Sequence, residues 1–522
     1  MRPIYAFAVI VAVLFLLALA RLARLDAAGP AHQFVNLPGQ EPATLYLPGT
    51  GENPFFRIFP PPNKPPAIVM VHGFTADRQF MSALARRVAQ NGYAVLAIDV
   101  SGHGANRNPF SAGEANQEGL RSDVKKAVDF LRSYQFVDGS KIAVMGHSMG
   151  AGATLDYATV DPNLKGVIMI SGGFSLAGPE RPKDALFIFA QNDPGFIKEV
   201  SKEIAAHLAG VPAVELGKTY GDFQQGNAVE AVQMPGLNHV TICYSPQAAE
   251  MMVKWLDNVF GTVRTGEINT VEPRRNAEIL AGLLFLAFLI PLGIITGEIA
   301  GEWAEGPTGL GGWLGLLWLV LALLAAMPMV ATIVPTAFFP FVVGDTQVAW
   351  NWVAGVILAI VLIAAHAFDW RRLRDGLGAT VIAAILAMMV VYLAQCATSV
   401  TLHTLALTPE RLIFTMVGAL LLFPFWLSFE FMLRRGSLVV STIRAVIGRA
   451  LILAMLVVGI VLQVLPGVLM LIIPQLVLIY VAVEIYAASA YSSSRNLLLI
   501  VLVESIWFSW SIAAVAPITF ML

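Results

Sequence analysis

One stretch of sequence decides the fold of this chain's first half: Lys141-Ile142-Ala143-Val144-Met145-Gly146-His147-Ser148-Met149-Gly150. It opens with a short apolar run typical of a buried strand. A Gly-x-Ser-x-Gly pentapeptide follows at once, and small residues from Ala151 onward favour a helix. A strand that turns this sharply into a helix holds the serine in a strained backbone conformation, and the flanking glycines leave room for the turn. We therefore expect Ser148 to project from the carboxyl end of a sheet.

The composition divides the chain into two parts. Of its 522 residues, 57% are hydrophobic and only 13% are charged, whereas about a quarter of the residues in an ordinary soluble domain are charged. All ten lysines lie at or before Lys254, and arginine is the only strongly basic residue from Asn276 to Leu522. We therefore predict a soluble part and a membrane part that join near residue 270. The formal net charge of −2 and the lack of a basic stripe give no reason to expect a nucleic-acid partner.

An unbroken apolar run from Ile4 to Ala20 lies near the start of the chain, with arginines on both sides. Its length suits either the core of a signal peptide or a membrane anchor. Because Ala-Ala-Gly at 27–29 is only a weak cleavage site, we favour an N-terminal transmembrane anchor over residues 1–25. The proline-rich segment of residues 26–66 then predicts an extended connector that includes the first strands.

From residue 67 to residue 262 the pattern alternates between strand and helix. We expect strands at 67–71, 94–100, 141–145, 166–171 and 185–190, and helices at 79–91, 119–134 and 246–260. Strands that alternate with helices predict a mostly parallel sheet with helices on both faces. A linker over residues 263–277 would follow this domain.

Residues 278–522 contain apolar stretches long enough to cross a bilayer. We place them near 279–295, 313–333, 350–367, 377–397, 412–433, 450–465, 468–488 and 497–517. Pro328, Pro335 and Pro340 favour a broken or re-entrant segment, and the pair around Pro466 is either two helices or one long kinked helix. Together with the N-terminal run, the pattern predicts roughly seven to nine membrane helices in an all-α polytopic transmembrane bundle.

The order of elements and several short motifs resemble the α/β-hydrolase family over residues 40–260. The motifs are Val71-His72-Gly73-Phe74, Asp99-Val100-Ser101-Gly102-His103-Gly104, the Ser148 pentapeptide, Gln191-Asn192-Asp193-Pro194 and Gly236-Leu237-Asn238-His239. The resemblance implies an α/β-hydrolase fold with a catalytic triad in the chain order nucleophile, acid, base. Ser148, Asp193 and His239 follow that order.

Each residue type suits this chemistry. A serine hydroxyl is a weak nucleophile at neutral pH, so a base must take its proton during attack. His239 fits because imidazole can accept that proton and return it to the leaving group. Asp193 would fix the tautomer of His239 and stabilise the imidazolium. The resemblance further implies that the backbone N–H groups of Phe74 and Met149 form the oxyanion hole.

Other residues compete for these roles. Ser148 could be an ordinary turn serine, and Asp193 precedes a proline and could be a loop aspartate. The rival acids are Asp184 and Asp222. His207 lies in a helix that looks solvated, which makes His239 the better base. The remaining motif residues are interpreted as supports of turns or packing: His72, Asp99, His103 and His147.

The interval between the strand at 166–171 and His239 is too short for the large cap that many lipases carry. Much of it is needed for Asp193 and one helix. We therefore predict a site that is open or is shielded by the membrane half.

Burying an ionisable side chain inside an apolar membrane span costs free energy, so such residues usually serve a structural or functional role. The candidates are Glu298, Glu302, Glu305, His366, His403, Glu430, Glu484 and Glu504. We favour placement at helix ends or pairing inside the bundle over a functional role, and no motif predicts a metal or organic cofactor.

Arginines at 371–374 and at Arg434 and Arg435 favour cytoplasmic loops, which places the hydrolase domain outside the cytoplasm. Arg274 and Arg275 oppose this orientation because they would then also lie outside.

The sequence thus predicts a membrane-integral serine hydrolase that cleaves carboxylic esters, including lipid esters, through an acyl-serine intermediate. Its partners would be a small-molecule or lipid ester and membrane lipids. Thioesters and peptides are further candidate substrates, because the triad does not encode the acyl group. Two alternatives stay open: acyl transfer to a lipid or glycan alcohol, and a transport or scaffold protein whose hydrolase-like domain only binds.

Overall fold

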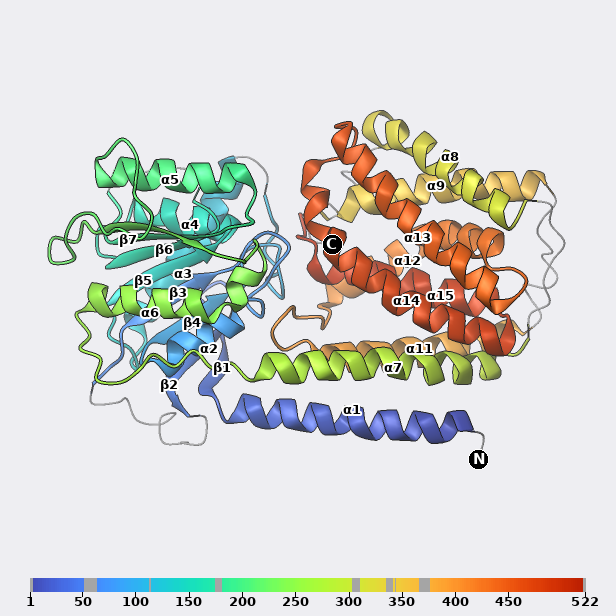
Figure 1. Cartoon of the computed structure of the whole chain (residues 1–522), viewed down its shortest axis with the longest axis horizontal. Coiled ribbons are helices and arrows are strands. Elements are labelled where there is room, and N and C mark those ends of the chain that lie inside the picture. The colour runs from blue at the N-terminus through green and yellow to red at the C-terminus, as the bar shows by residue number, and fades with distance from the viewer. Residues whose placement is uncertain are drawn as a thin grey trace.

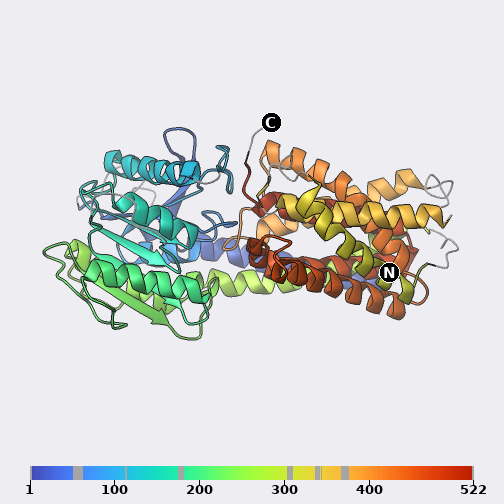
Figure 2. The ribbon, with the colours of Figure 1, turned by 90° about the horizontal axis from the view of Figure 1, so that it is seen from above.

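The computed structural model describes residues 3–50, 63–111, 114–173, 181–302, 310–334, 341–342, 344–365 and 376–519. Two bodies lie along the long axis of the molecule (Figure 1): a sheet with helices on both faces, and a bundle of long helices. Seen from above, the bundle helices extend away from the sheet along that same axis (Figure 2).

An eight-stranded sheet forms the centre of the first body. Its spatial order is β1 (Pro30–Asn36), β2 (Pro42–Thr50), β4 (Ala94–Ile98), β3 (Ala67–Val71), β5 (Ile142–His147), β6 (Gly166–Ile170), β7 (Ala185–Ala190) and β8 (Val229–Met234). The pairs β1–β2 and β2–β4 are antiparallel, and every pair from β4 to β8 is parallel. The predicted mostly parallel sheet is confirmed. Strand β8 was not predicted, because Glu230 and Gln233 interrupt its apolar run.

Helices cover both faces of the sheet (Figure 1). On one face α3 (Glu114–Ser133), α4 (Met149–Ala158) and α5 (Gly195–Ala209) enclose a core that includes Val124, Leu155 and Leu208. On the other, α2 (Ser82–Gln90) and α6 (Pro246–Phe260) enclose a core that includes Leu84 and Met252. Fully buried central strands such as β3 and β5 need this double cover, because both of their faces are apolar.

Among the described residues, nine helices are long and apolar enough to cross a membrane, which lies within the predicted range. They are α1 (Pro3–Ala27), α7 (Arg274–Ala300), α8 (Trp313–Thr332), α9 (Gly344–Ala364), α11 (Leu377–Thr398), α12 (Pro409–Leu433), α13 (Leu438–Val461), η3 with α14 (Gly467–Ile472 and Ile473–Ser494) and α15 (Leu497–Val515). Leu16, Leu420 and Leu478 are more than half exposed on the outside of this region. Such apolar outer faces are what lipid-facing helices require.

Among the bundle helices, α13 and α9 begin furthest ahead of their predicted starts. Helix α13 begins at Leu438 rather than near residue 450, because Arg444 and Arg449 interrupt the apolar run but are buried inside the bundle. Helix α9 begins at Gly344 rather than at residue 350. Pro466 precedes η3, so α13 and α14 are separate helices and not one kinked helix. Pro328 lies inside α8, whereas Pro335 and Pro340 lie outside the described residues.

A cluster of buried ion pairs lies inside the bundle. Arg434 pairs with Glu430 and Glu484, and Arg449 pairs with Glu430, Glu484 and Glu504. The prediction that such residues pair inside the bundle is correct for these three glutamates. Arg434 follows the last residue of α12, in keeping with the predicted loop position, but its side chain is fully buried among the carboxylates.

The other ionisable candidates lie elsewhere. Glu298, near the end of α7, accepts a hydrogen bond from the Tyr5 hydroxyl at 2.6 Å. Glu302 is exposed just beyond that helix. His403 lies in the loop between α11 and α12, against the Phe80 ring of the hydrolase domain. Glu305 and His366 fall outside the described residues.

The carboxyl edge of the sheet docks on the end of the bundle. Beyond α15, Ile518 exchanges backbone hydrogen bonds with the loop after β4, donating to the Gly102 carbonyl at 2.9 Å and accepting from the Phe110 N–H at 2.7 Å. In the loop between α11 and α12, the Thr404 N–H donates to Asp77, which follows β3, at 2.6 Å. The strand ends that carry the predicted site therefore face the helices.

Replacing Arg449 by methionine should destabilise the bundle, because three buried glutamates would keep only Arg434 as a cation. Removing one partner of a buried ion pair costs about 3–5 kcal/mol. Glu504→Gln should be tolerated better, because carboxylates outnumber guanidiniums in the cluster and glutamine still accepts from Arg449. Thermal unfolding of the purified variants in detergent compares them. Equal unfolding temperatures for Arg449→Met and the unmodified protein would contradict the expectation.

Candidate active site

Ser148 occupies the sharp turn between β5 and α4. Its φ of 53° lies in the left-handed region, which costs a non-glycine residue energy and marks strain at a functional turn. Its N–H donates to the Ile170 carbonyl at 2.9 Å, which ties the turn to β6. A Cβ atom at Gly146 would overlap the Gly150 carbonyl, and one at Gly150 would overlap that of Val71. Both glycines are therefore required by close backbone approach.

The structure brings the three predicted triad residues into one hydrogen-bonded line. The Ser148 Oγ lies 3.0 Å from the His239 Nε2. The His239 Nδ1 lies 2.8 Å from the Asp193 Oδ1. These residues come from the ends of three elements, namely β5, β7 and the segment after β8. The arrangement can pass a proton from the hydroxyl to the imidazole while the carboxylate holds the ring.

Asp193 is held by two further hydrogen bonds to its other oxygen. The Ser171 hydroxyl and the Ala190 N–H each donate to Oδ2 at 2.6 Å. Burial by itself would raise the pKa of Asp193, but the bonds from His239, Ser171 and Ala190 lower that pKa below its ordinary value. Asp193 is therefore a carboxylate at neutral pH. Sequence reasoning missed Ser171, whose only signal is its place at the end of β6, beside β7.

His147 supports the histidine of the triad. Its Nε2 lies 2.8 Å from the His239 backbone oxygen, and the two rings lie 4.8 Å apart. Burial, with the neighbouring His239, lowers the pKa of His147 to about 3. His147 is therefore neutral at pH 7. A neutral ring donates to the backbone without opposing a positive charge that forms on His239.

The turn that contains Phe74 passes directly beside the serine. A Cβ atom at Gly73 would lie 3.1 Å from the Ser148 Cβ, so only glycine lets the turn approach this closely. The Phe74 ring packs 5.8 Å from the rings of both His103 and Phe110. Thr75 follows with a φ of 59°, a strained conformation for a β-branched residue. Met149 begins α4 immediately after Ser148. The oxyanion hole formed by the N–H groups of Phe74 and Met149 stays a prediction.

The remaining motif residues hold loops in place. The His72 ring contacts the Gly73 carbonyl at 2.8 Å and accepts from the Val100 N–H at 3.2 Å. Asp99 pairs with Arg78 and accepts from the Ala105 N–H. The His103 Nδ1 contacts the Ser101 carbonyl at 3.0 Å.

The rival acids and base lie away from the triad's hydrogen-bonded line. Asp184 stands at the opposite end of β7 from Asp193 and accepts from the Ala228 N–H at 3.0 Å. Burial raises the pKa of Asp184 to about 6. Asp222 accepts from the Gln224 N–H in a turn, and His207 is exposed on α5.

A hollow of about 700 Å³ opens at the serine. Its walls are the turn itself and the facing sides of α3 and α4: Asn116, Gln117, Leu120, Ser148, Met149, Gly152, Ala153 and Asp156. The His239 side chain is 18% exposed, so the site is reachable from solvent. Within the described part of the chain, no group of three or more His, Cys, Asp and Glu side chains is placed to hold a metal ion.

Comparisons with known proteins agree with this geometry. Residues 62–196 match the family model described as serine aminopeptidase, S33. Cutinase 1 of Thermobifida cellulosilytica is 33% identical over 105 residues, which are 20% of this chain and 38% of the cutinase. Bis(hydroxyethyl) terephthalate hydrolase of Streptomyces coelicolor is 29% identical over 152 residues, which are 28% of this chain and 45% of that enzyme. The chain thus spans less than half the length of these relatives.

Among solved structures, an esterase of Pyrobaculum calidifontis aligns with 47% of this chain and 91% of its own, with 20% identity and a TM-score of 0.32. The sheet topology and the sequence matches agree on the nature of the first body. The chain contains an esterase- and cutinase-like α/β-hydrolase domain of the serine hydrolase type, followed by a region of helices apolar enough to span a membrane.

Proposed function

We propose that this protein is a membrane-integral serine esterase that cleaves carboxylic esters through an acyl-Ser148 intermediate. The observation that carries the proposal is the hydrogen-bonded line from Ser148 through His239 to Asp193. The substrate class is the one that the names of the cutinase and terephthalate ester hydrolase relatives indicate.

The reaction proceeds in two halves that use the same residues. The Ser148 Oγ attacks the ester carbonyl carbon while the His239 Nε2 takes its proton, and the carbonyl oxygen becomes an oxyanion at the N–H groups of Phe74 and Met149. The carbon–oxygen ester bond then breaks, and His239 gives its proton to the departing alcohol. Water next attacks the acyl-serine, giving a proton to His239. Collapse of the second tetrahedral intermediate returns that proton to Ser148 and releases the carboxylic acid.

The position of the domain supports esters that reside in or near a membrane. The carboxyl edge of the sheet, where the triad lies, docks on the ends of helices that are apolar enough to span a bilayer. We therefore assign the helical region the place of a cap, which the described residues of the hydrolase domain do not form. A substrate anchored in lipid would therefore have to extend only across this junction to reach Ser148.

We further propose that the hydrolase domain lies outside the cytoplasmic membrane. Helix α1 begins at the bundle end remote from the hydrolase domain (Figure 1), and Arg435 and Arg495 follow helices that end there. Basic residues favour the cytoplasmic side. Arg274 at the opposite end forms ion pairs with Asp26 and Glu272, so its charge is compensated. Arg371, Arg372 and Arg374 lie outside the described residues.

Ser148→Ala should abolish hydrolysis of p-nitrophenyl esters and labelling by a fluorophosphonate probe. The expected loss is roughly a million-fold in kcat, as for other serine nucleophiles. The purified full-length protein in detergent is assayed beside Ser140→Ala, an exposed serine on the hydrolase surface whose loss should leave both signals unchanged. Full esterase activity in Ser148→Ala would overturn the proposed function.

Asp193→Asn and Asp184→Asn should have opposite consequences although both residues border β7. Asp193→Asn should lower kcat about 10⁴-fold, because the amide favours the wrong tautomer of the histidine. Asp184→Asn should retain activity and raise stability. The folded pKa of Asp184 is raised above its unfolded value, so its ionisation costs stability as the pH rises from about 4 through about 6.

Unfolding temperatures measured between pH 4 and pH 8 test the stability half of this comparison. The gain from Asp184→Asn should be present at pH 7 to 8 and vanish near pH 4. Equal activity in the two variants would contradict the assignment of Asp193 as the acid of the triad. A stability gain confined to low pH would contradict the raised pKa of Asp184.

The orientation can be read from two single cysteines introduced at opposite ends of the molecule. Val263→Cys, on the hydrolase side, should react with a membrane-impermeant maleimide in intact cells. Ser437→Cys, in the turn after α12, should react only after the cells are permeabilised. The reverse pattern would place the hydrolase domain in the cytoplasm.

A further inference from the structure

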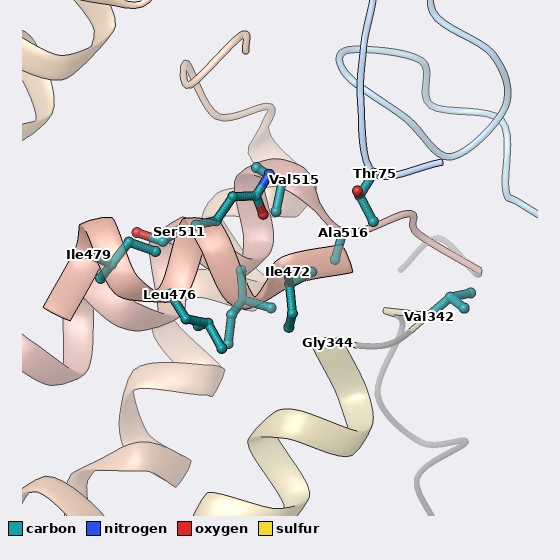
Figure 3. A pocket seen from close by; sticks show the side chains of 11 residues that line it. Thr75, Val342, Gly344, Ile472, Leu476, Ile479, Ser511, Val515 and Ala516 are labelled. Carbon is teal, nitrogen blue, oxygen red and sulfur yellow. The ribbon is translucent and has the colours of Figure 1, made fainter. Parts of the chain in front are cut away.

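A second hollow lies where the hydrolase domain meets the helical region (Figure 3). It holds about 370 Å³ of space that no atom fills, part of which is open to its surroundings. Thr75 borders it from the hydrolase domain, and residues of α14 and α15 form most of the opposite wall: Ile472, Leu476, Ile479, Ser511 and Val515. We call it the junction groove.

We propose that the junction groove binds the acyl chain of the ester substrate, which makes esters of long-chain fatty acids the preferred substrates. This inference rests on the proposed esterase function and adds the acyl half of the substrate to it. The occupant follows from the lining, from the position of the groove beside the turn that carries the proposed oxyanion donor, and from its access to lipid.

The lining suits a hydrocarbon chain. Ile472 at the end of η3 and Leu476 and Ile479 of α14 recur at helical spacing and form an apolar stripe that lines the groove, with Val515 of α15 also in the lining (Figure 3). None of the lining residues carries a charge. Transfer of methylene groups from water into such a site is favourable in proportion to the apolar area that becomes buried. A charged or strongly polar ligand would find no ion-pairing partner in this lining.

The groove also lies on the acyl side of the serine. Thr75 directly follows Phe74, whose N–H is the proposed oxyanion donor, and Gly73 before it approaches the Ser148 side chain. The donor binds the carbonyl oxygen, and the carbonyl carbon carries both the acyl chain and the alcohol oxygen; we place the acyl chain beside this turn. The alcohol oxygen must instead lie beside His239, which protonates it. The hollow at Ser148, with Asn116, Gln117 and Asp156, is polar enough to take the alcohol.

Lipid has a path to the groove along α14. On the outer face of this helix Val477, Leu478 and Val481 are between 42% and 69% exposed. The residues just before the helix, Met470 and Leu471, are also exposed. Apolar surface therefore continues from the lipid-facing side of α14 to the edge of the junction groove. A fatty acyl chain can stay in apolar surroundings while its ester group reaches Ser148.

Leu476→Trp tests the inference by filling the groove. The kcat/KM values for p-nitrophenyl palmitate and p-nitrophenyl acetate are measured on the full-length protein in lipid nanodiscs. Both esters release the same alcohol, so the ratio of the two values reports the acyl side alone. In Leu476→Trp the palmitate-to-acetate ratio should fall about tenfold or more. The matched control is Leu420→Trp on the lipid-facing side of α12, a helix that does not line the groove, where the ratio should stay as in the unmodified protein.

A second variant and a second readout keep the result decisive. Val515→Phe narrows the groove from α15, and its ratio decides the question if Leu476→Trp does not fold. Labelling of Ser148 by fluorophosphonates with a long or a short alkyl chain should show the same loss of preference for the long chain. An unchanged palmitate-to-acetate ratio in folded groove variants would overturn the inference but not the esterase function. That result would also be expected if the groove held only a structural lipid. Absence of turnover for both esters and of Ser148 labelling in the unmodified protein would overturn the esterase function itself.

Discussion

The placement of the catalytic edge depends on one buried guanidinium, that of Arg411 near the start of α12. It is only 2% exposed and donates to carbonyls of both bodies: Gly102 and Gly104 after β4, and Ala513 and Ala516 at the end of α15. Hydrogen bonds to a charged group contribute about 1.5–3 kcal/mol each, and a buried cation without them is costly. Because Ile518 bonds to the same loop, moving the hydrolase domain off the bundle would break both sets of bonds together.

On the proposed function, this junction would let the hydrolase domain, whose described residues form no cap insertion, bind an apolar substrate. The domain supplies Ser148, His239 and Asp193, the proposed nucleophile, base and acid, from its own strand ends, and the His239 side chain is partly exposed. The apolar surface of the proposed acyl-binding groove comes mainly from α14 and α15, which lie against the turn after β3. The proposed chemistry and the proposed recognition of the acyl chain would thus be divided between two bodies with separate cores. The buried ion pairs of Arg434 and Arg449 join helices of the second body.

Local patterns in the sequence predicted the strands from β3 to β7 and the three residues that the structure joins by hydrogen bonds, because the residues of a strand, a turn or a motif are adjacent in sequence. Contacts between residues that are distant in sequence could not be predicted from local patterns. Ser171 reads as an ordinary serine at a strand end until β7 places Asp193 beside it. Arg411 reads as a common helix-start arginine, and the residues of the junction groove read as any apolar span. The start of α13 was misplaced for the same reason: its arginines look exposed in sequence and are paired in space.

Three turns at neighbouring strands store strain at the site, and the docking helps to explain why they persist. Thr75, Ser148 and Ser171 follow β3, β5 and β6, and each has a positive φ, which costs about 1–3 kcal/mol for a residue other than glycine. Backbone bonds to the next strand hold two of them, from Ser148 N–H to Ile170 and from Ser171 N–H to Ile188. The turn at Thr75 instead leads to Asp77, which accepts the Thr404 N–H of the helical region, and Thr75 itself packs at the junction groove. The helical region therefore helps to hold this third turn, which the His72 ring also contacts at the Gly73 carbonyl, and the turn carries the proposed oxyanion donor.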